Sequence, residues 1–376
     1  MGRIDTLLAM MTVEEKIGQL NMITSSRAVT GPGELHDVAE GIRSGRIGAL
    51  LNLWGADEVR AVQRLAVEES RLRVPLLLGL DVIHGHHTIF PVPLAEACLF
   101  DPALWEKTAR AAAEEAAMDG VAMTFAPMLD VARDPRWGRI VEGPGEDPWV
   151  ASEFAAAKTR GFQGRDLSAA DSLAATAKHL GAYGAVTAGR EYASADLSER
   201  TLHEIYLPPF AAAVAAGTAA IMPAFNDIAG VPTTANAPLL RGWLRDRLGF
   251  EGVLISDYNA IAELLDHGVA ADIAEAAALV LKAGVDIDIM SNAYAQGLPE
   301  ALQRGLVGMA EIDASVRRVL ALKERLGLFD DVDGMPLDDP SPMHEARWRF
   351  VQRNPRNPAY CETGRPYLRR TSGLND

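Results

Sequence analysis

Short apolar runs that each end on a polar residue alternate along this chain with alanine-rich stretches of helical composition. This alternation is typical of a parallel α/β sheet, because the crossover between two parallel strands is long enough to contain a helix. The pattern predicts seven strands, at residues 47–52, 75–81, 122–130, 173–180, 219–225, 252–257 and 285–290.

Two architectures accommodate such a pattern. Seven strands, with one more that is irregular or missed, fit a (β/α)8 TIM-like barrel. A doubly wound open sheet is the alternative, but it normally binds a nucleotide at its switch point, and no glycine-rich phosphate loop follows any predicted strand. We therefore predict a barrel over residues 1–330. From residue 331 the chain is rich in Pro and Arg without strand or helix periodicity, which predicts an irregular tail over 331–376.

Charge and hydropathy exclude two classes of partner. The formal net charge is −15 and no run rich in Lys and Arg is present, which argues against nucleic acid. The longest uncharged stretch, 205–226, is interrupted by prolines and consists mostly of alanine. It predicts a helix followed by a buried strand, and we expect no membrane partner.

The start of the chain and its cysteines bear on location. Thr12 precedes Glu14 and Glu15 in the manner of a helix cap, so we interpret this region as a first helix and not as a signal peptide. Two cysteines, Cys98 and Cys361, are too few to require a disulfide framework. These features predict a cytoplasmic protein.

Polar residues end several of the predicted strands. Asp257 ends strand 252–257 and is followed by Tyr258, Asp81 ends strand 75–81, and Lys178 with His179 lies near the end of strand 173–180. A single Asp after a strand is as often a helix cap as a functional residue. In a barrel, however, the carboxyl ends of the strands converge on one pocket, which is where barrel enzymes carry out their chemistry.

The loop segment 130–148 brings arginines, including Arg139, among several carboxylates such as Glu142. One interpretation is a solvated loop held by its own ion pairs. The other is a sugar site, because an arginine fork beside carboxylates offers the fixed donors and acceptors that sugar hydroxyls need.

Other chemistries find less support. His84, His86 and His87 lie close together, but their spacing is not the helical i, i+4 pair, and neither a cysteine nor a second histidine cluster completes a site, so we predict no metal. No Gly-x-Ser-x-Gly nucleophile elbow is present, and Cys98 lies in an apolar helix-like run, which favours a core position over a nucleophile.

Together these motifs resemble glycoside hydrolase family 3, in particular its bacterial β-glucosidase and β-xylosidase branch. The matching stretches are GLDVIHG, APMLDVARDPRWGRIVEGPGEDP, AKHLGAYGAVTAGREYASADLSERTLHEIYLPPF and GFEGVLISDY, and the resemblance covers roughly residues 10–330. It implies a barrel that hydrolyses β-glycosides with retention of configuration and without a cofactor. The residues that it implies are Asp257 as nucleophile and, for substrate binding, Asp81, Arg139, Lys178, His179, Met222 and Tyr258, with Glu142 in support.

The chain also departs from this family. His87 stands where many relatives have Arg. Relatives continue into a second domain that supplies the general acid/base, and the branch that uses a histidine acid carries Lys-His-Phe-Pro-Gly-His-Gly where this chain has KHLGAYGAVTAG, so we assign no acid/base. We expect impaired hydrolysis, with a catalytically silent sugar-binding barrel as the alternative.

The tail suggests a reason for the missing domain. Codons for residues 353–364 can be chosen that re-read, in another frame, as the opening of the family's second domain, so we predict a frameshift near residues 340–353. A barrel without that domain would expose apolar surface, from which we expect a homodimer or poor solubility.

Overall fold

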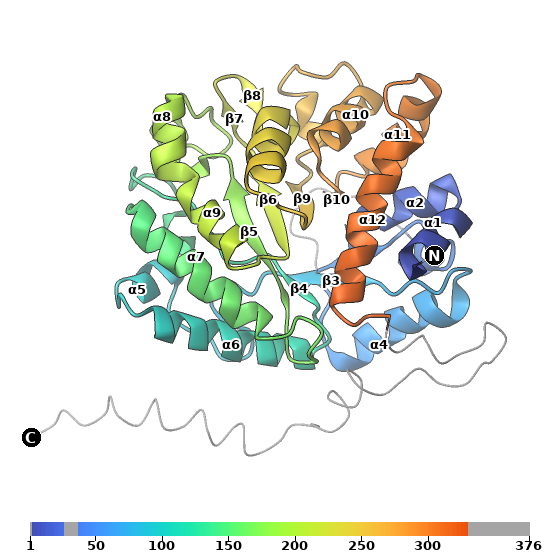
Figure 1. Ribbon diagram of the computed structural model, residues 1–376, viewed down its shortest axis with the longest axis horizontal. Coiled ribbons are helices and arrows are strands. Elements are labelled where there is room, and N and C mark those ends of the chain that lie inside the picture. The colour runs from blue at the N-terminus through green and yellow to red at the C-terminus, as the bar shows by residue number, and fades with distance from the viewer. Residues whose placement is uncertain (1, 26–36, 330–376) are drawn as a thin grey trace, which may run out of the picture.

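A computed structural model describes residues 2–25 and 37–329 of the chain. Eight parallel strands close into a barrel in the order β1-β10-β9-β6-β5-β4-β3-β2 (Figure 1). These strands are β1 (Asn21–Thr24), β2 (Ala49–Leu51), β3 (Leu77–Leu80), β4 (Met123–Thr124), β5 (Ala174–Leu180), β6 (Ala220–Pro223), β9 (Val253–Tyr258) and β10 (Ile287–Ile289). The (β/α)8 barrel is thus confirmed, and a short antiparallel hairpin, β7 (Asp227–Ile228) with β8 (Val231–Pro232), follows β6.

Helices surround the barrel and occupy the connections between its strands. The larger ones are α1 (Arg3–Met10), α2 (Val13–Gln19), α3 (Val38–Arg43), α4 (Ala56–Arg64), α6 (Pro102–Met118), α7 (Pro148–Gln163), α9 (Pro208–Ala215), α10 (Ile273–Ala283), α11 (Ala293–Gln303), α12 (Met309–Arg325) and the π-helical η7 (Pro238–Arg247). Shorter segments are η1 (Leu65–Glu69), α5 (Pro93–Ala97), η2 (Ile140–Glu142), η3 (Tyr183–Ala185), η4 (Thr187–Gly189), α8 (Glu199–Thr201), η5 (Leu202–Tyr206), η6 (Thr233–Ala235) and η8 (Ala262–Leu264). None of the helices in the described ranges is long and apolar enough to cross a membrane.

Each of the seven predicted strands overlaps an observed strand, and β1 is the one that the pattern missed. It has four residues and begins at Asn21, two positions after α2 ends at Gln19, so no turn residue or long apolar run marks it. The predicted strand 122–130 is ladder-paired only over β4. Pro127 has no N–H to donate, and the pairing resumes as a single bridge between Met128 and Lys178.

The first predicted helix and its cap are present. The Thr12 hydroxyl accepts a hydrogen bond from the N–H of Glu15 (3.2 Å), and the Glu15 carboxylate accepts one from the N–H of Thr12 (2.9 Å). This capping box starts α2. The uncharged stretch 205–226 contains α9 followed by the buried strand β6, as predicted.

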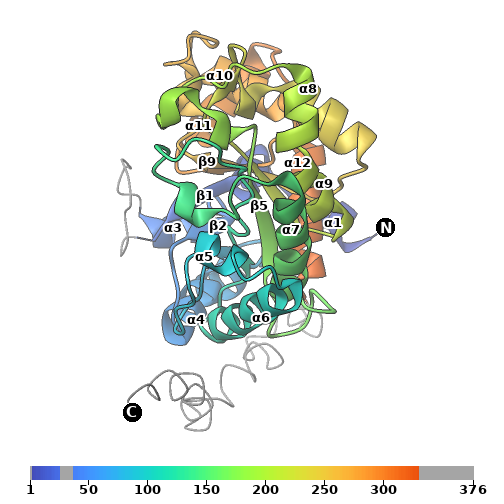
Figure 2. The same ribbon diagram turned by 90° about the vertical axis from the view of Figure 1, so that its left-hand side faces the viewer.

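The alanine-rich helices allow close packing around the barrel. Helices α6 and α7 lie side by side on one flank (Figure 2). Within α7, a Cβ at Gly161 would lie 2.4 Å from the carbonyl oxygen of Glu106 in α6, so only glycine permits this approach. One expectation is wrong here: Cys98, at the end of α5, is exposed and is not a core residue. The predicted tail over 331–376, with Cys361 and the proposed frameshift, lies outside the described residues.

Candidate active site

A cavity of about 510 Å³ opens at the carboxyl ends of the barrel strands, within the range usual for small-molecule sites. Its lining includes six of the seven residues that the sequence singled out, namely Asp81, Arg139, Lys178, Met222, Asp257 and Tyr258. The seventh, His179, is buried directly behind the lining and contacts Asp257. The barrel therefore brings together residues from β5, β6, β9 and the loops after β3 and β4.

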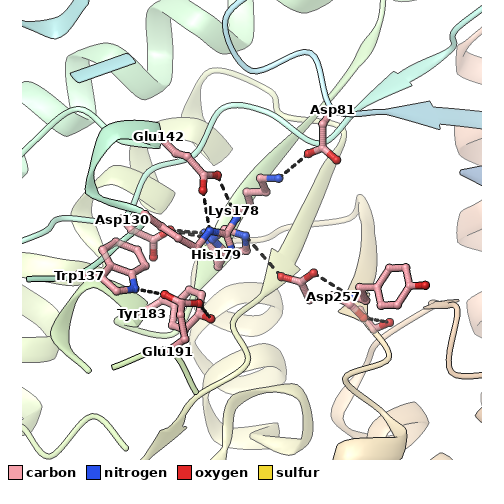
Figure 3. A network of polar contacts seen from close by, with 12 residues as sticks. Asp81, Asp130, Trp137, Glu142, Lys178, His179, Tyr183, Glu191 and Asp257 are labelled. Carbon is pink, nitrogen blue, oxygen red and sulfur yellow. Dashed lines mark hydrogen bonds and ion pairs between the residues drawn. The ribbon is translucent and has the colours of Figure 1, made fainter. Parts of the chain in front are cut away.

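Asp257 lies near the end of β9, and its two carboxylate oxygens have different surroundings. Oδ1 accepts a hydrogen bond from the N–H of Tyr258 (2.7 Å). Oδ2 is buried and accepts no hydrogen bond within the described ranges, although His179 Nε2 lies 3.4 Å away (Figure 3). One carboxylate oxygen thus fixes the orientation of the side chain, while the other keeps its lone pairs free of any donor.

Burial and neighbouring charges act in opposite directions on Asp257. Burial disfavours the carboxylate form and raises the pKa of Asp257 to about 6, and the nearby charge of Asp81 adds to this. The positive charges of Lys178 and Arg139 and the N–H of Tyr258 limit the rise. Most Asp257 side chains are therefore ionised at neutral pH, which is the form that a nucleophile requires.

His179 connects Asp257 to a second buried carboxyl group, Asp130. The N–H of His179 donates to Asp130 Oδ2 (3.0 Å), and His179 Nδ1 lies 2.8 Å from the same oxygen. Burial lowers the pKa of His179 well below its usual value, and the charges of Arg139 and Lys178 lower it further. A neutral imidazole anchored by Asp130 thus faces Asp257.

Lys178 and Asp81 form an ion pair across the cavity. Lys178 Nζ donates to Asp81 Oδ1 (2.6 Å), with Lys178 almost fully buried and about half of the Asp81 side chain exposed (Figure 3). The pair combines cationic donors with an exposed carboxylate acceptor. Such a set suits adjacent sugar hydroxyls, each of which both donates and accepts.

Arg139 and Glu142 form a second pair on the loop after β4. Arg139 Nε donates to Glu142 Oε1 (2.7 Å) and its Nη2 donates to Oε2 (2.9 Å), which is a two-point contact. Burial opposes ionisation of Glu142, but the Arg139 hydrogen bonds and charge outweigh it and lower the pKa of Glu142. The guanidinium also lies over the ring of Tyr183, 5.7 Å from its centroid. The loop is therefore held by an internal ion pair, as one interpretation of the sequence predicted, and it also lines the cavity.

Two carboxylates of the network, Glu191 and Asp130, were missed by sequence reasoning. Glu191 accepts hydrogen bonds from the Trp137 indole and the Tyr183 hydroxyl, and this joins the loop after β4 to the loop after β5 (Figure 3). Asp130 anchors His179. Each lies inside a stretch that the sequence had marked, but only the fold identifies the partner. A further carboxyl group, Glu263 in η8, has its pKa raised to about 7 by burial and by the charge of Asp257.

Comparison with known proteins identifies the family. Residues 12–322 match the model of the glycosyl hydrolase family 3 N-terminal domain. The chain belongs to glycosyl hydrolase family 3. The family resemblance seen in the sequence is thus confirmed, and the match spans the whole barrel.

Relatives within the family are longer than this chain. A periplasmic β-glucosidase of Salmonella typhimurium is 41% identical over 329 residues, which are 87% of this chain and 42% of that protein. A putative β-xylosidase of Formosa agariphila is 36% identical over 348 residues, covering 88% of this chain and 46% of that protein. The crystal structure of a Listeria innocua β-glucosidase in complex with isofagomine superposes with a TM-score of 0.83 at 39% identity, covering 90% of this chain and 48% of that one. The chain spans less than half the length of these three relatives.

Proposed function

We propose that this chain binds the nonreducing-end residue of a β-glycoside in the barrel cavity and that Asp257 attacks its anomeric carbon. The observation that carries the proposal is the state of Asp257. Its carboxylate lines the cavity, is oriented through Oδ1 alone, and has Lys178 and Arg139 close enough to favour its charged form. β-Glucosidase and β-xylosidase names among the relatives support the same class of substrate.

The proposed reaction has two displacement steps. An Asp257 oxygen forms a bond to the anomeric carbon while the bond to the leaving oxygen breaks, and that oxygen takes up a proton. Water then attacks the glycosyl ester, loses a proton and releases the sugar with net retention. The Lys178–Asp81 pair and Arg139 would bind the outer hydroxyls and so orient the ring for attack.

A second candidate, a sugar-binding barrel without turnover, has one observation in its favour. Besides Asp257, the carboxylates that line the cavity in the described part of the chain are Asp81 and Glu142, and each is paired with a cation. The hydrogen bonds and charge of Arg139 lower the pKa of Glu142, which makes this carboxyl group a poor proton donor. With no proton donor, unactivated glycosides would bind without being cleaved.

Mechanism-based labelling tests the nucleophile. A 2-fluoro β-glycoside with a dinitrophenyl leaving group should add one glycosyl unit per chain, and peptide mapping should locate it on Asp257. Asp257→Asn, which keeps the size of the side chain, should take up no label. Label on another residue would refute the assignment.

Activated substrates separate the two candidates. Dinitrophenol leaves without being protonated, so a barrel with a working nucleophile should release a burst of it even without an acid. A pure binding protein should release none while still binding the sugar, as calorimetry would detect. The glucoside and the xyloside are compared in parallel, because relatives of both kinds are known.

Two further expectations from the sequence remain predictions. Homodimer formation would be measured by light scattering of the purified chain, and a single stable monomer would contradict it. The cytoplasmic location would be tested by cell fractionation, which is worthwhile because the Salmonella typhimurium relative is named as periplasmic.

A further inference from the structure

Two adjacent histidines and an aspartate meet beside the barrel mouth. His86 and His87 lie in the loop after β3, and Asp119 directly follows α6. His86 Nε2 is 2.7 Å and His87 Nε2 is 2.9 Å from the same oxygen, Asp119 Oδ2. One ligand atom from each residue falls within a group no more than 4.8 Å across. The cluster could not be identified from the sequence, because its carboxylate lies more than thirty residues away from the histidines.

The loop that carries the two histidines is held in place. Gly85 has a φ of +124°, which L side chains rarely adopt, and it forms an antiparallel bridge with Ile89. The carboxylate of Glu115 accepts hydrogen bonds from the N–H groups of His87 (2.9 Å) and Thr88 (2.7 Å) and from the Thr88 hydroxyl (2.6 Å). Glu115 precedes Asp119 by about one helical turn, so α6 holds both the backbone and the imidazoles of this loop.

We propose that His86, His87 and Asp119 form a binding site for a divalent transition metal ion of the zinc class. Two imidazole nitrogens and one carboxylate oxygen lie close enough together for a single ion to bind all three. The carboxylate of Asp119 also lies at the carboxyl end of α6, where the helix dipole favours a cation. This site is separate from the sugar cavity, whose lining includes none of the three residues.

Binding of such an ion requires the three ligand atoms, which now lie within 4.8 Å of one another, to rearrange around it. Zinc bound tetrahedrally at about 2.0–2.1 Å holds neighbouring ligand atoms roughly 3.3 Å apart. The two contacts to Asp119 Oδ2 therefore widen by roughly half an ångström on binding. His87, whose side chain is 63% exposed, is free to make this adjustment, while His86 is 9% exposed and stays fixed. Water would complete the coordination on the exposed side.

The donor set selects the metal. Imidazole nitrogen is a good ligand for zinc, nickel and copper, whereas calcium and magnesium prefer sites made of oxygen. Two nitrogens and one carboxylate oxygen thus favour the first group. The ion would clamp the loop after β3 onto α6, and because that loop begins at Asp81, it would also steady one wall of the sugar cavity.

Calorimetric titration of the purified, metal-stripped chain with Zn²⁺ tests the site. We expect one saturable equivalent and a higher melting temperature in its presence. His87→Arg places a cation opposite Asp119 but offers no lone pair, so it should weaken binding at least about tenfold. Asp119→Asn removes the anionic ligand while keeping its shape and should do the same. His203→Ala, at an exposed histidine in η5, is the matched control and should bind as the wild type does.

Spectroscopy identifies the ligands independently of glycosidase activity. Bound Cu²⁺ should show hyperfine coupling to imidazole nitrogen that is reduced in His87→Arg. The proposal is overturned if the wild type shows no saturable binding of Zn²⁺. It is equally overturned if both His87→Arg and Asp119→Asn, shown by circular dichroism to be folded, bind Zn²⁺ as tightly as the wild type.

Discussion

The proposed attack by Asp257 should depend on pH because its carboxyl group is buried. An aspartate with the ordinary pKa of 3.8 is about 94% ionised at pH 5, whereas with a pKa of about 6 it is about 9% ionised there and about 91% ionised at pH 7. Because only the carboxylate form can serve as the proposed nucleophile, kcat/KM should fall about tenfold between pH 7 and pH 5. An unburied aspartate would lose almost nothing over this interval.

The assay uses dinitrophenyl β-glycosides, whose leaving group needs no proton, so that the acid limb of kcat/KM reports the nucleophile and not a general acid. Circular dichroism at each pH confirms that the chain stays folded. A profile that is flat from pH 7 down to pH 5 would refute the reasoning from burial.

The same limb tests the role of Lys178. Its positive charge lowers the pKa of Asp257, so Lys178→Met should move the acid limb to higher pH. Asp81, which would lose its partner, raises the pKa of Asp257 and acts in the same direction. Lys107→Met, at an exposed position on α6, removes the same charge away from the cavity and should leave the limb in place. A limb that stays unmoved in Lys178→Met would contradict the electrostatic account.

Three further predictions concern the framework of the site. Arg139→Lys cannot make the two-point contact with Glu142 and should raise KM for aryl glycosides about tenfold. An unchanged KM would show that Arg139 does not contribute to substrate binding. Lys158→Met leaves Glu96 buried without its cation and should lower the free energy of unfolding, measured with urea, by about 3–5 kcal/mol. Adding Glu96→Gln should restore part of this stability, and a loss below about 1 kcal/mol in Lys158→Met would contradict the prediction. Gly85→Ala places a Cβ 1.9 Å from a backbone carbonyl oxygen at positive φ and should lower the free energy of unfolding by about 1–3 kcal/mol. Its melting temperature should be lower than that of the control Gly138→Ala, where a Cβ meets nothing within 4 Å.

The positions of the strands could be predicted from the sequence wherever a strand had a long apolar run. Strands β5 and β9 have seven and six residues and were predicted nearly to their ends. β1 was missed because four residues directly after a helix carry too little period-2 signal. Its place in the barrel depends on pairing with β2 and β10, which are distant in sequence.

The cavity residues were identified for a similar reason. Asp81, Lys178 and Asp257 each lie at or near the end of a strand, and a closed parallel barrel places all such ends on one face. Cys98 shows the limit of this kind of inference. An apolar neighbourhood in sequence predicted burial, but the short helix α5 ends at this point and leaves the side chain exposed.

The sequence by itself determined the barrel and the convergence of Asp81, Lys178 and Asp257 at its mouth, because strand periodicity and the residue at each strand end are local properties of the chain. The family and the remaining site residues followed from the resemblance of its motifs to a known family. Only the tertiary structure decided the pKa of Asp257, the anchoring of His179 by Asp130, and the meeting of His86 and His87 with Asp119. Desolvation and through-space contacts depend on which segments pack together, and that information is not carried by any one segment.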